Sequence, residues 1–237
     1  MKRTLLLAGI PIETTIRFEQ EVPVFSPFFT ETPPLAYAAV PPAALAAARQ
    51  FYIPDATDPY IDYMELCPRV SDALLPFNRS VFHGVAFVWR SKAWLLTAVS
   101  GTGKTTQYVL WKWLYGTDVR ILNGDKPILE IRQDGVTVHP SPWKGKEGIG
   151  QLHTAPLGGI ILLRQSTQNS IRRLSAAEAA ADIYEQFLFS RRCTDDLRAV
   201  ARLADTLLRI APVWLLENQG DEASARLCHD TLMEETV

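Results

Sequence analysis

The chain has 237 residues, of which 47% are apolar and 21% charged, and its formal net charge is −2 at pH 7. This balance is typical of a soluble globular protein with one large domain, or with one domain and a small appendage. The net charge is near zero, so the chain has no excess of positive charge that would bind nucleic acid or an anionic membrane. No apolar run reaches the roughly 18–20 residues of a membrane span. The three cysteines are scattered and suggest neither a disulfide framework nor a zinc site. We therefore expect a cytoplasmic protein without nucleic-acid or membrane partners.

Residues 1–80 are rich in proline and irregular in pattern. The apolar run at 1–10 is too short for a signal peptide and predicts a first strand, with further short strands joined by turns after it. Proline positions and capping residues predict three short helices, at 41–49, 57–66 and 71–76. We expect residues 1–80 to form a small accessory layer that carries no chemistry, packed against a nucleotide-binding domain formed by residues 81–237.

From residue 81 the pattern changes to buried strands and longer helices. The strands are predicted at 81–89, 93–97, 119–122, 128–132, 136–138, 159–163 and 213–216, with a turn at 90–92 and a hairpin turn at 133–135. The helices are predicted at 175–188, after a Ser175–Glu178 capping box, at 194–210 and at 222–233. The arginine pairs at 172–173 and 191–192 are interpreted as solvated helix faces. The order of these predicted strands and helices along the chain predicts a mixed α/β (α+β) fold with C-terminal helices rather than a regular doubly wound sheet.

The stretch 98–106, Ala-Val-Ser-Gly-Thr-Gly-Lys-Thr-Thr, has the composition of a phosphate-binding loop, or P-loop. A predicted strand precedes it and an amphipathic segment at 108–114 follows it, which is the setting that this motif requires. Lys104 can reach the β- and γ-phosphates, and the hydroxyl of Thr105 can hold Mg²⁺. The sequence therefore predicts ATP and Mg²⁺ as cofactors, and the cofactor-binding residues are Ser100, Gly101, Thr102, Gly103, Lys104, Thr105 and Thr106.

Ala98 stands where the usual P-loop spacing has a glycine. A positive φ would cost alanine on the order of 1 kcal/mol, so we expect a negative φ at this position. The alternative interpretation of the whole stretch is a chance Gly/Thr turn between a strand and a helix.

Asp125 directly follows the predicted strand 119–122 and its Asn-Gly turn, about 20 residues beyond the P-loop. A carboxylate there can bind the Mg²⁺ held by Thr105 or take a proton from an incoming hydroxyl. Lys126 can neutralise phosphate oxygens. For both residues the alternative is an ordinary solvated turn.

Two further regions supply candidate site residues. His83 lies on the strand that leads into the P-loop, where a core histidine is the alternative interpretation. The segment 141–147 combines proline, an aromatic side chain, glycine and two lysines, so it can fold over a phosphorylated ligand with Lys144 or Lys146 facing the transferred charge.

We expect Asp125, Lys104, His83 and Lys146 to be catalytic. The expected substrate contacts are His83, Lys126, Trp143, Lys144 and Lys146. Arg164 and Asn169 are candidates for the adenine site, with a surface loop as the alternative.

Taken in order, three motifs resemble the HPr kinase/phosphorylase and ATP-dependent phosphoenolpyruvate carboxykinase group. They are Phe-His-Gly-Val at 82–85, Ser-Gly-Thr-Gly-Lys-Thr-Thr at 100–106 and Asn-Gly-Asp-Lys-Pro at 123–127. The segments 142–147 and 156–160 are similar to small, kinase-sized homologues of that group. The resemblance covers residues 80–190. It implies a carboxykinase-like nucleotide fold with Lys104 on the phosphates, Thr105 and Asp125 at the metal, and His83 near the phosphoryl acceptor.

The sequence also departs from this group. Both larger families carry a second acidic residue where Lys126 stands here, which puts a two-metal site in doubt and makes Asp125 the single expected base or ligand. The chain is too short for the large oxaloacetate-binding domain of the carboxykinases, so decarboxylation is the least expected activity. No match appears to the C-terminal region by which HPr kinases engage their protein substrate.

We therefore expect a Mg-ATP-dependent kinase that phosphorylates a hydroxyl of a small molecule. The small homologues suggest a polyol, with myo-inositol as the first candidate. The alternatives are a protein or peptide serine kinase like HPr kinase, which requires a groove open to a polypeptide, and a non-catalytic nucleotide switch. The sequence leaves the oligomeric state open, and a homo-oligomer is compatible with it.

Overall fold

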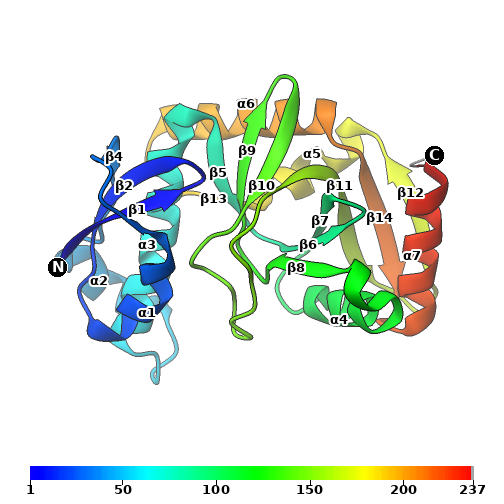
Figure 1. The fold of residues 1–237 in the computed structure, drawn as a ribbon, viewed down its shortest axis with the longest axis horizontal. Helices are drawn as coiled ribbons and strands as arrows, with labels where there is room; N and C mark the ends of the chain where they lie inside the picture. Colours follow the sequence, from blue (N-terminus) through cyan, green and yellow to red (C-terminus); the bar gives the residue numbers. More distant parts are fainter. Residues whose placement is uncertain (236–237) are drawn as a thin grey trace.

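The computed structural model describes residues 1–235 and contains two β-sheets (Figure 1). The smaller sheet has the strand order β3-β1-β2-β4, and three helices and four 3₁₀ turns surround it. Its strands are β1 (Lys2–Leu7), β2 (Ile10–Thr15), β3 (Phe29–Thr30) and β4 (Ala36–Tyr37). Its helices are α1 (Val22–Phe25), α2 (Pro42–Ala48) and α3 (Asp58–Leu74), and its 3₁₀ turns are η1 (Glu19–Glu21), η2 (Ser26–Phe28), η3 (Arg49–Phe51) and η4 (Leu75–Phe77). Residues 1–78, which contain all of these elements, are called the N-terminal unit below.

The larger sheet joins two groups of strands through one long strand, β11 (Ala155–Gln165). The start of β11 pairs with β10, and the rest pairs in parallel with β7 on one side and β14 on the other. The remaining strands are β5 (Arg79–Phe82), β6 (Val85–Trp89), β7 (Lys92–Thr97), β8 (Arg120–Asn123), β9 (Ile128–Arg132), β10 (Gly135–His139), β12 (Ser170–Leu174), β13 (Phe187–Leu188) and β14 (Val213–Asn218). Parallel and antiparallel pairs occur in the same sheet, so the fold is mixed α+β, as the sequence predicts.

Helices cover both faces of this sheet. Helices α5 (Ala176–Glu185) and α6 (Thr194–Ile210) bury side chains such as Ile183 and Leu207 against one face. Helices α4 (Lys104–Tyr115) and α7 (Glu222–Glu235) bury Trp111 and Leu232 against the other face. A short 3₁₀ turn, η5 (Gly116–Asp118), follows α4. No helix within residues 1–235 is long and apolar enough to cross a membrane.

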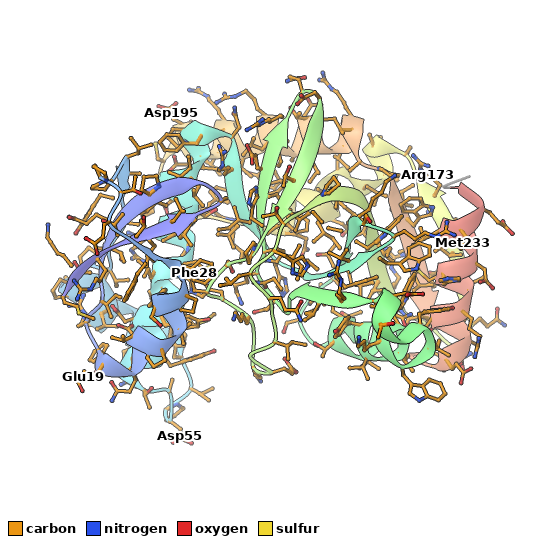
Figure 2. The ribbon with its side chains drawn as sticks, viewed as in Figure 1. Glu19, Phe28, Asp55, Arg173, Asp195 and Met233 are labelled. Carbon is orange, nitrogen blue, oxygen red and sulfur yellow. The ribbon has the colours of Figure 1, made fainter. Side chains whose placement is uncertain are left out.

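The N-terminal unit shares its core with the larger sheet. Figure 1 shows β1, β2 and α3 at one end of the molecule and α4 and α7 at the other. The cluster of buried side chains that contains Leu5 and Leu66 also contains Val81, Ile128 and Trp143. Figure 2 shows Asp55 at the outer tip of the segment between α2 and α3. Because the apolar contacts are continuous, the N-terminal unit is fixed against the strands that carry the site.

Several sequence-based predictions are corrected by the structure. The predicted helices 57–66 and 71–76 belong largely to one helix, α3, which continues through Pro68 and is followed by η4. Proline removes one backbone hydrogen bond, but the helix buries Leu66, Val70 and Leu74 on both sides of it, and this burial outweighs the loss. Strand 81–89 is two strands, because β5 pairs with β9 whereas β6 pairs with β7 and β8.

The other corrections concern the C-terminal half. The predicted helix 175–188 ends at Glu185, and Phe187 and Leu188 form β13 on the edge of β5. The capping box itself is present, since the Ser175 hydroxyl accepts from the Glu178 N–H and the Glu178 carboxylate accepts from the Ser175 N–H. The pair 172–173 lies on strand β12, and the pair 191–192 lies outside any helix, so neither is a helix face. Arg172 and Arg173 are both exposed on this edge strand, so a pair of charged residues alone does not distinguish an edge strand from a solvated helix face.

Candidate functional site

Strand direction brings three separate segments to one edge of the larger sheet. Strand β6 runs antiparallel to both β7 and β8, so the start of β6 lies where β7 and β8 end. His83 precedes β6, the P-loop follows β7, and Asp125 follows β8. Side chains from all three segments line one pocket of about 560 Å³. The three motifs that the sequence singled out are therefore neighbours in space.

The P-loop has the backbone shape of an anion-binding loop. Gly101 and Gly103 have φ values of +83° and +105°, which strain residues with a side chain. Helix α4 begins at Lys104, and its N-cap is Gly103, so no side chain caps the first helical N–H groups. Those N–H groups have no partner within the helix, and the helix dipole makes this end partly positive. Ala98 has a negative φ, as predicted, and its methyl group packs in the core beneath α4.

Lys104 lies against the loop that precedes it. Its Nζ donates a hydrogen bond to the carbonyl oxygen of Ala98 at 3.0 Å, and only 8% of the residue is exposed. Burial lowers the pKa of Lys104, and the nearby carboxylate of Asp125 opposes that effect. Among the other P-loop residues, Ser100, Gly101, Gly103, Thr105 and Thr106 also line the pocket, whereas the Thr102 hydroxyl bonds to the carbonyl of Val99.

A buried asparagine fixes the backbone of Asp125. The Oδ1 of Asn123 accepts from the N–H groups of Asp125 at 2.9 Å and Lys126 at 2.8 Å, and its Nδ2 donates to the carbonyl of Ser141 at 3.2 Å. At Gly124, a Cβ would lie 2.7 Å from the carbonyl oxygen of Lys144, so a side chain does not fit. The sequence pattern indicates a role for Asp125 but none for Asn123. The Asn-Gly pair is a turn signal that could have indicated one.

The carboxylate of Asp125 lies between two basic side chains. One oxygen forms an ion pair with Lys126 Nζ, and the other lies 3.6 Å from Nε2 of His83. On the far side of the ring, His83 Nδ1 lies 3.2 Å from Oε1 of Gln186, an atom that can only accept. A neutral ring that carries its proton on Nδ1 can donate to this oxygen, and Nε2 is then the unprotonated nitrogen on the side of Asp125.

Burial lowers the pKa of His83, and the positive charge of Lys104 lowers it further. The imidazole is thus neutral near pH 7. Gln186 holds His83 a second time, because the His83 N–H donates to the Gln186 carbonyl at 2.8 Å. Sequence reasoning missed Gln186, and nothing in its local pattern marks it. It follows the last turn of α5 and reaches the site only through the pairing of β13 with β5.

The segment 141–148 closes one side of the pocket. Its anchor is Trp143, which is 1% exposed and donates from Nε1 to the carbonyl of Tyr63 at 2.8 Å. Gly145 has a φ of +77° and lies against the side chain of Asp125. Lys146 is exposed, and both Lys146 and the buried Trp143 line the pocket. Lys144 does not line it.

Helix α3 forms the remaining wall. Tyr60, Tyr63 and Met64 line the same pocket as Asp125 and Lys104. The sequence analysis assigned no site residue to positions 1–80, because aromatic and apolar side chains in a proline-rich segment resemble ordinary core residues. Only the docking of the N-terminal unit against the larger sheet reveals their position.

The residues proposed for a metal carry the type of atom that Mg²⁺ prefers. The hydroxyl of Thr105 and the carboxylate of Asp125 line the same pocket, and magnesium is usually held by one or two carboxylates together with substrate phosphates. Within residues 1–235 no group of three or more His, Cys, Asp and Glu side chains is arranged to hold a metal by itself. The donor set therefore fits a magnesium ion that arrives with a nucleotide, and does not form a cage made of protein ligands alone.

The two residues considered for the adenine have other contacts. Arg164 lies 3.9 Å from the carboxylate of Glu217, and the Asn169 amide bonds to Asp221 and to the N–H of Gln219. Neither residue lines the pocket described above.

Comparison with known proteins gives matches among solved structures alone. No family model matches the chain, and no curated protein matches it. Among solved structures, the Hpr(Ser) kinase/phosphatase from Coxiella burnetii matches with a TM-score of 0.37 and 9% sequence identity, over 66% of this chain and 99% of that one. At this TM-score and identity the likeness carries no conclusion about the function of the chain.

Proposed function

We propose that this protein is a Mg-ATP-dependent kinase that transfers the γ-phosphoryl group of ATP to a hydroxyl group. The observation that carries the proposal is the meeting of the P-loop, Asp125 and His83 in one pocket. A glycine-shaped loop at a helix N-terminus, followed by a lysine and a threonine, is suited to a triphosphate. A carboxylate that lines the same pocket is suited to an acceptor hydroxyl.

In this proposal Lys104 leaves the Ala98 carbonyl and binds the β- and γ-phosphates. Thr105 and Asp125 hold the magnesium ion, which offsets negative charge on the phosphates when it is bound. The acceptor oxygen forms a bond to the γ-phosphorus while the bond from that phosphorus to the bridging oxygen of ADP breaks. The acceptor proton passes to the carboxylate of Asp125. His83, held neutral by Gln186 and by burial, lies beside this carboxylate and helps to define where the acceptor is held.

Lys126 and Lys146 supply further positive charge. Lys126 is paired with Asp125 and only 13% of its side chain is exposed, so its ammonium stays near the reacting groups. Lys146 lies on the segment 141–148, which contains Gly145 and Gly148 at positive φ. Phosphoryl transfer depends mainly on positioning the reactants and on stabilising the negative charge of the transferred group. These two lysines provide charge stabilisation.

The acceptor expected from the sequence, a polyol such as myo-inositol, has no support from the comparisons. The Tyr60–Tyr63–Met64 wall also weighs against a fully hydroxylated ring. A peptidic serine is the second candidate, and one observation favours it. Phe51 and Ile53, which are 82% and 72% exposed, flank Tyr52, whose ring contacts Tyr60 at the pocket. Exposed apolar side chains next in the chain to a residue that contacts the pocket wall favour a surface that receives a larger molecule.

The test is ATP consumption with a panel of polyols, hydroxy acids, serine and short serine peptides. Wild type is compared with Lys104→Ala, Asp125→Asn and, as a matched control, the exposed Lys92→Ala. We expect at least one acceptor to stimulate turnover, Asp125→Asn to lower kcat by roughly 10²–10⁴-fold, and Lys104→Ala to weaken ATP binding about 10- to 100-fold. If ATP binds with Lys104-dependent affinity but no acceptor is phosphorylated, the protein is a nucleotide switch and the kinase proposal fails.

A further inference from the structure

We infer that the first turns of α3, contributed by the N-terminal unit, form the acceptor wall of the pocket, and that they select a hydroxyl carried on an apolar or aromatic body. This inference rests on the proposed kinase function and names the class of its acceptor. Tyr60, Tyr63 and Met64 occupy positions i, i+3 and i+4 of α3, so they share one face of the helix. All three line the pocket that contains Asp125.

The hydroxyl group that Tyr63 contributes to this wall is engaged within the protein. The Tyr63 hydroxyl donates to the carbonyl of Pro142 at 3.0 Å, and the Trp143 indole N–H donates to the carbonyl of Tyr63 at 2.8 Å. Burial raises the pKa of the Tyr63 phenol, so it stays uncharged. What Tyr63 and Met64 offer to a ligand is therefore ring surface and a thioether. A thioether side chain adapts its shape to apolar groups.

The pocket therefore combines two kinds of lining. Lys104, Asp125 and Lys126 provide charge for the phosphoryl group, whereas α3 contributes aromatic rings and a thioether to the same pocket. An acceptor whose hydroxyl reaches Asp125 places the rest of its body near α3. A polyol would place several hydroxyl groups against these side chains, and each hydroxyl that is buried without a partner costs free energy. An apolar body would instead cover Tyr60, which is 46% exposed.

The wall is fixed in place and does not depend on an induced contact. Two hydrogen bonds attach α3 to the segment that closes the pocket. One joins the Tyr63 hydroxyl to the Pro142 carbonyl, and the other joins the Trp143 indole to the Tyr63 carbonyl. At the other end of the helix, the Ser71 hydroxyl accepts from the N–H of Val81 at 2.9 Å. Both ends of α3 are thus attached to the domain that carries the P-loop. A rigid apolar wall discriminates by shape and polarity better than a mobile one.

The test uses two acceptors that share a propanediol frame, glycerol and 2-phenyl-1,3-propanediol, in which a phenyl group replaces the central hydroxyl. Binding of each is measured by calorimetry in the presence of Mg²⁺ and a non-hydrolysable ATP analogue, and kcat/KM is measured with ATP. We expect the phenyl compound to bind about tenfold or more tightly than glycerol. Tyr60→Ser and Met64→Ser should each remove most of that preference while the affinity for the ATP analogue stays unchanged. Leu35→Ser, at an exposed apolar position of the same unit that does not line the pocket, should leave the preference intact.

The inference is overturned if glycerol or myo-inositol binds as tightly as the phenyl compound, if neither acceptor binds, or if Tyr60→Ser and Met64→Ser keep the wild-type preference. These outcomes differ from a failure of the kinase proposal. If the kinase proposal fails, the ATP analogue binds equally to wild type and Lys104→Ala. It also fails if the phenyl compound binds in a Met64-dependent manner but is not phosphorylated.

Discussion

Tyr63 and Trp143 hold each other's segments reciprocally: the Trp143 indole donates to the Tyr63 carbonyl, and the Tyr63 hydroxyl donates to the carbonyl of Pro142, the residue before Trp143. Their rings also lie in contact, with centroids 6.0 Å apart. This relationship attaches the N-terminal unit to the segment that closes the pocket. It makes α3 a part of the candidate site, although the sequence places it in an accessory layer.

Replacement of Trp143 by phenylalanine removes the indole donor and leaves a gap in a fully buried position. We expect Trp143→Phe to lower the free energy of unfolding by about 2–4 kcal/mol, because a buried carbonyl loses its partner and packing is lost. Urea denaturation measures the change. Trp113, which is 69% exposed, provides the matched control, and Trp113→Phe should change stability by less than about 0.5 kcal/mol. Equal effects of the two substitutions would contradict the anchoring role.

Lys104 lowers the pKa of His83 through its positive charge, in addition to the effect of burial. We therefore expect His83 to titrate below the ordinary histidine value of about 6.5 in the metal-free protein. Lys104→Ala should raise this pKa, because the cationic form of the imidazole is no longer repelled. The imidazole resonances in an NMR titration report both values. Lys92→Ala should leave the His83 titration unchanged, and a His83 pKa above 6.5 in wild type would be incompatible with the neutral ring described here.

Glu21 makes the N-terminal unit sensitive to pH. The residue is 4% exposed, and burial raises the pKa of its carboxyl to about 7, with the nearby Asp62 carboxylate adding to the effect. Between its ordinary value of 4.5 and about 7 the folded state holds a proton that the unfolded state has released. Stability should therefore fall as pH rises through this window, by up to about 3 kcal/mol.

Glu21→Gln removes the ionisable group and keeps an oxygen that can accept from the N–H groups of Arg17 and Phe18. We expect the variant to be more stable than wild type at pH 8 and to lose the pH dependence between 4.5 and 7. Urea midpoints measured at pH 5 and pH 8 test this. Glu31→Gln, at an exposed position of the same unit, is the control and should follow the wild-type profile.

Gly124 and Gly135 offer a matched pair of substitutions. A Cβ at Gly124 would lie 2.7 Å from the Lys144 carbonyl and 2.9 Å from the Ile149 carbonyl, both backbone atoms. Gly124→Ala should therefore destabilise the fold by about 1–3 kcal/mol and displace Asp125, lowering turnover. A Cβ at Gly135 would meet no atom within 4 Å, and Gly135→Ala should be neutral or stabilise by up to about 1 kcal/mol. Thermal unfolding and ATP consumption measure the two effects, and an unaffected Gly124→Ala protein would show that the turn has room to relax.

The sequence by itself determined the local structure of several segments of this protein. The P-loop between β7 and α4, the 128–139 hairpin and the Ser175–Glu178 capping box each depend on residues that are close along the chain, so their patterns are readable without the fold. The same holds for the negative φ of Ala98, which follows from the cost of a left-handed alanine.

Only the tertiary structure decided which distant residues share the pocket. Gln186 reaches His83 through the pairing of β13 with β5, and Tyr63 reaches Trp143 because α3 packs against the larger sheet. Neither contact leaves a periodic or compositional signal, since each joins segments separated by 79 or more positions along the chain. The antiparallel direction of β6 relative to β7 and β8 gathers these groups at one edge, and that direction is set by long-range strand pairing and packing rather than by any local preference.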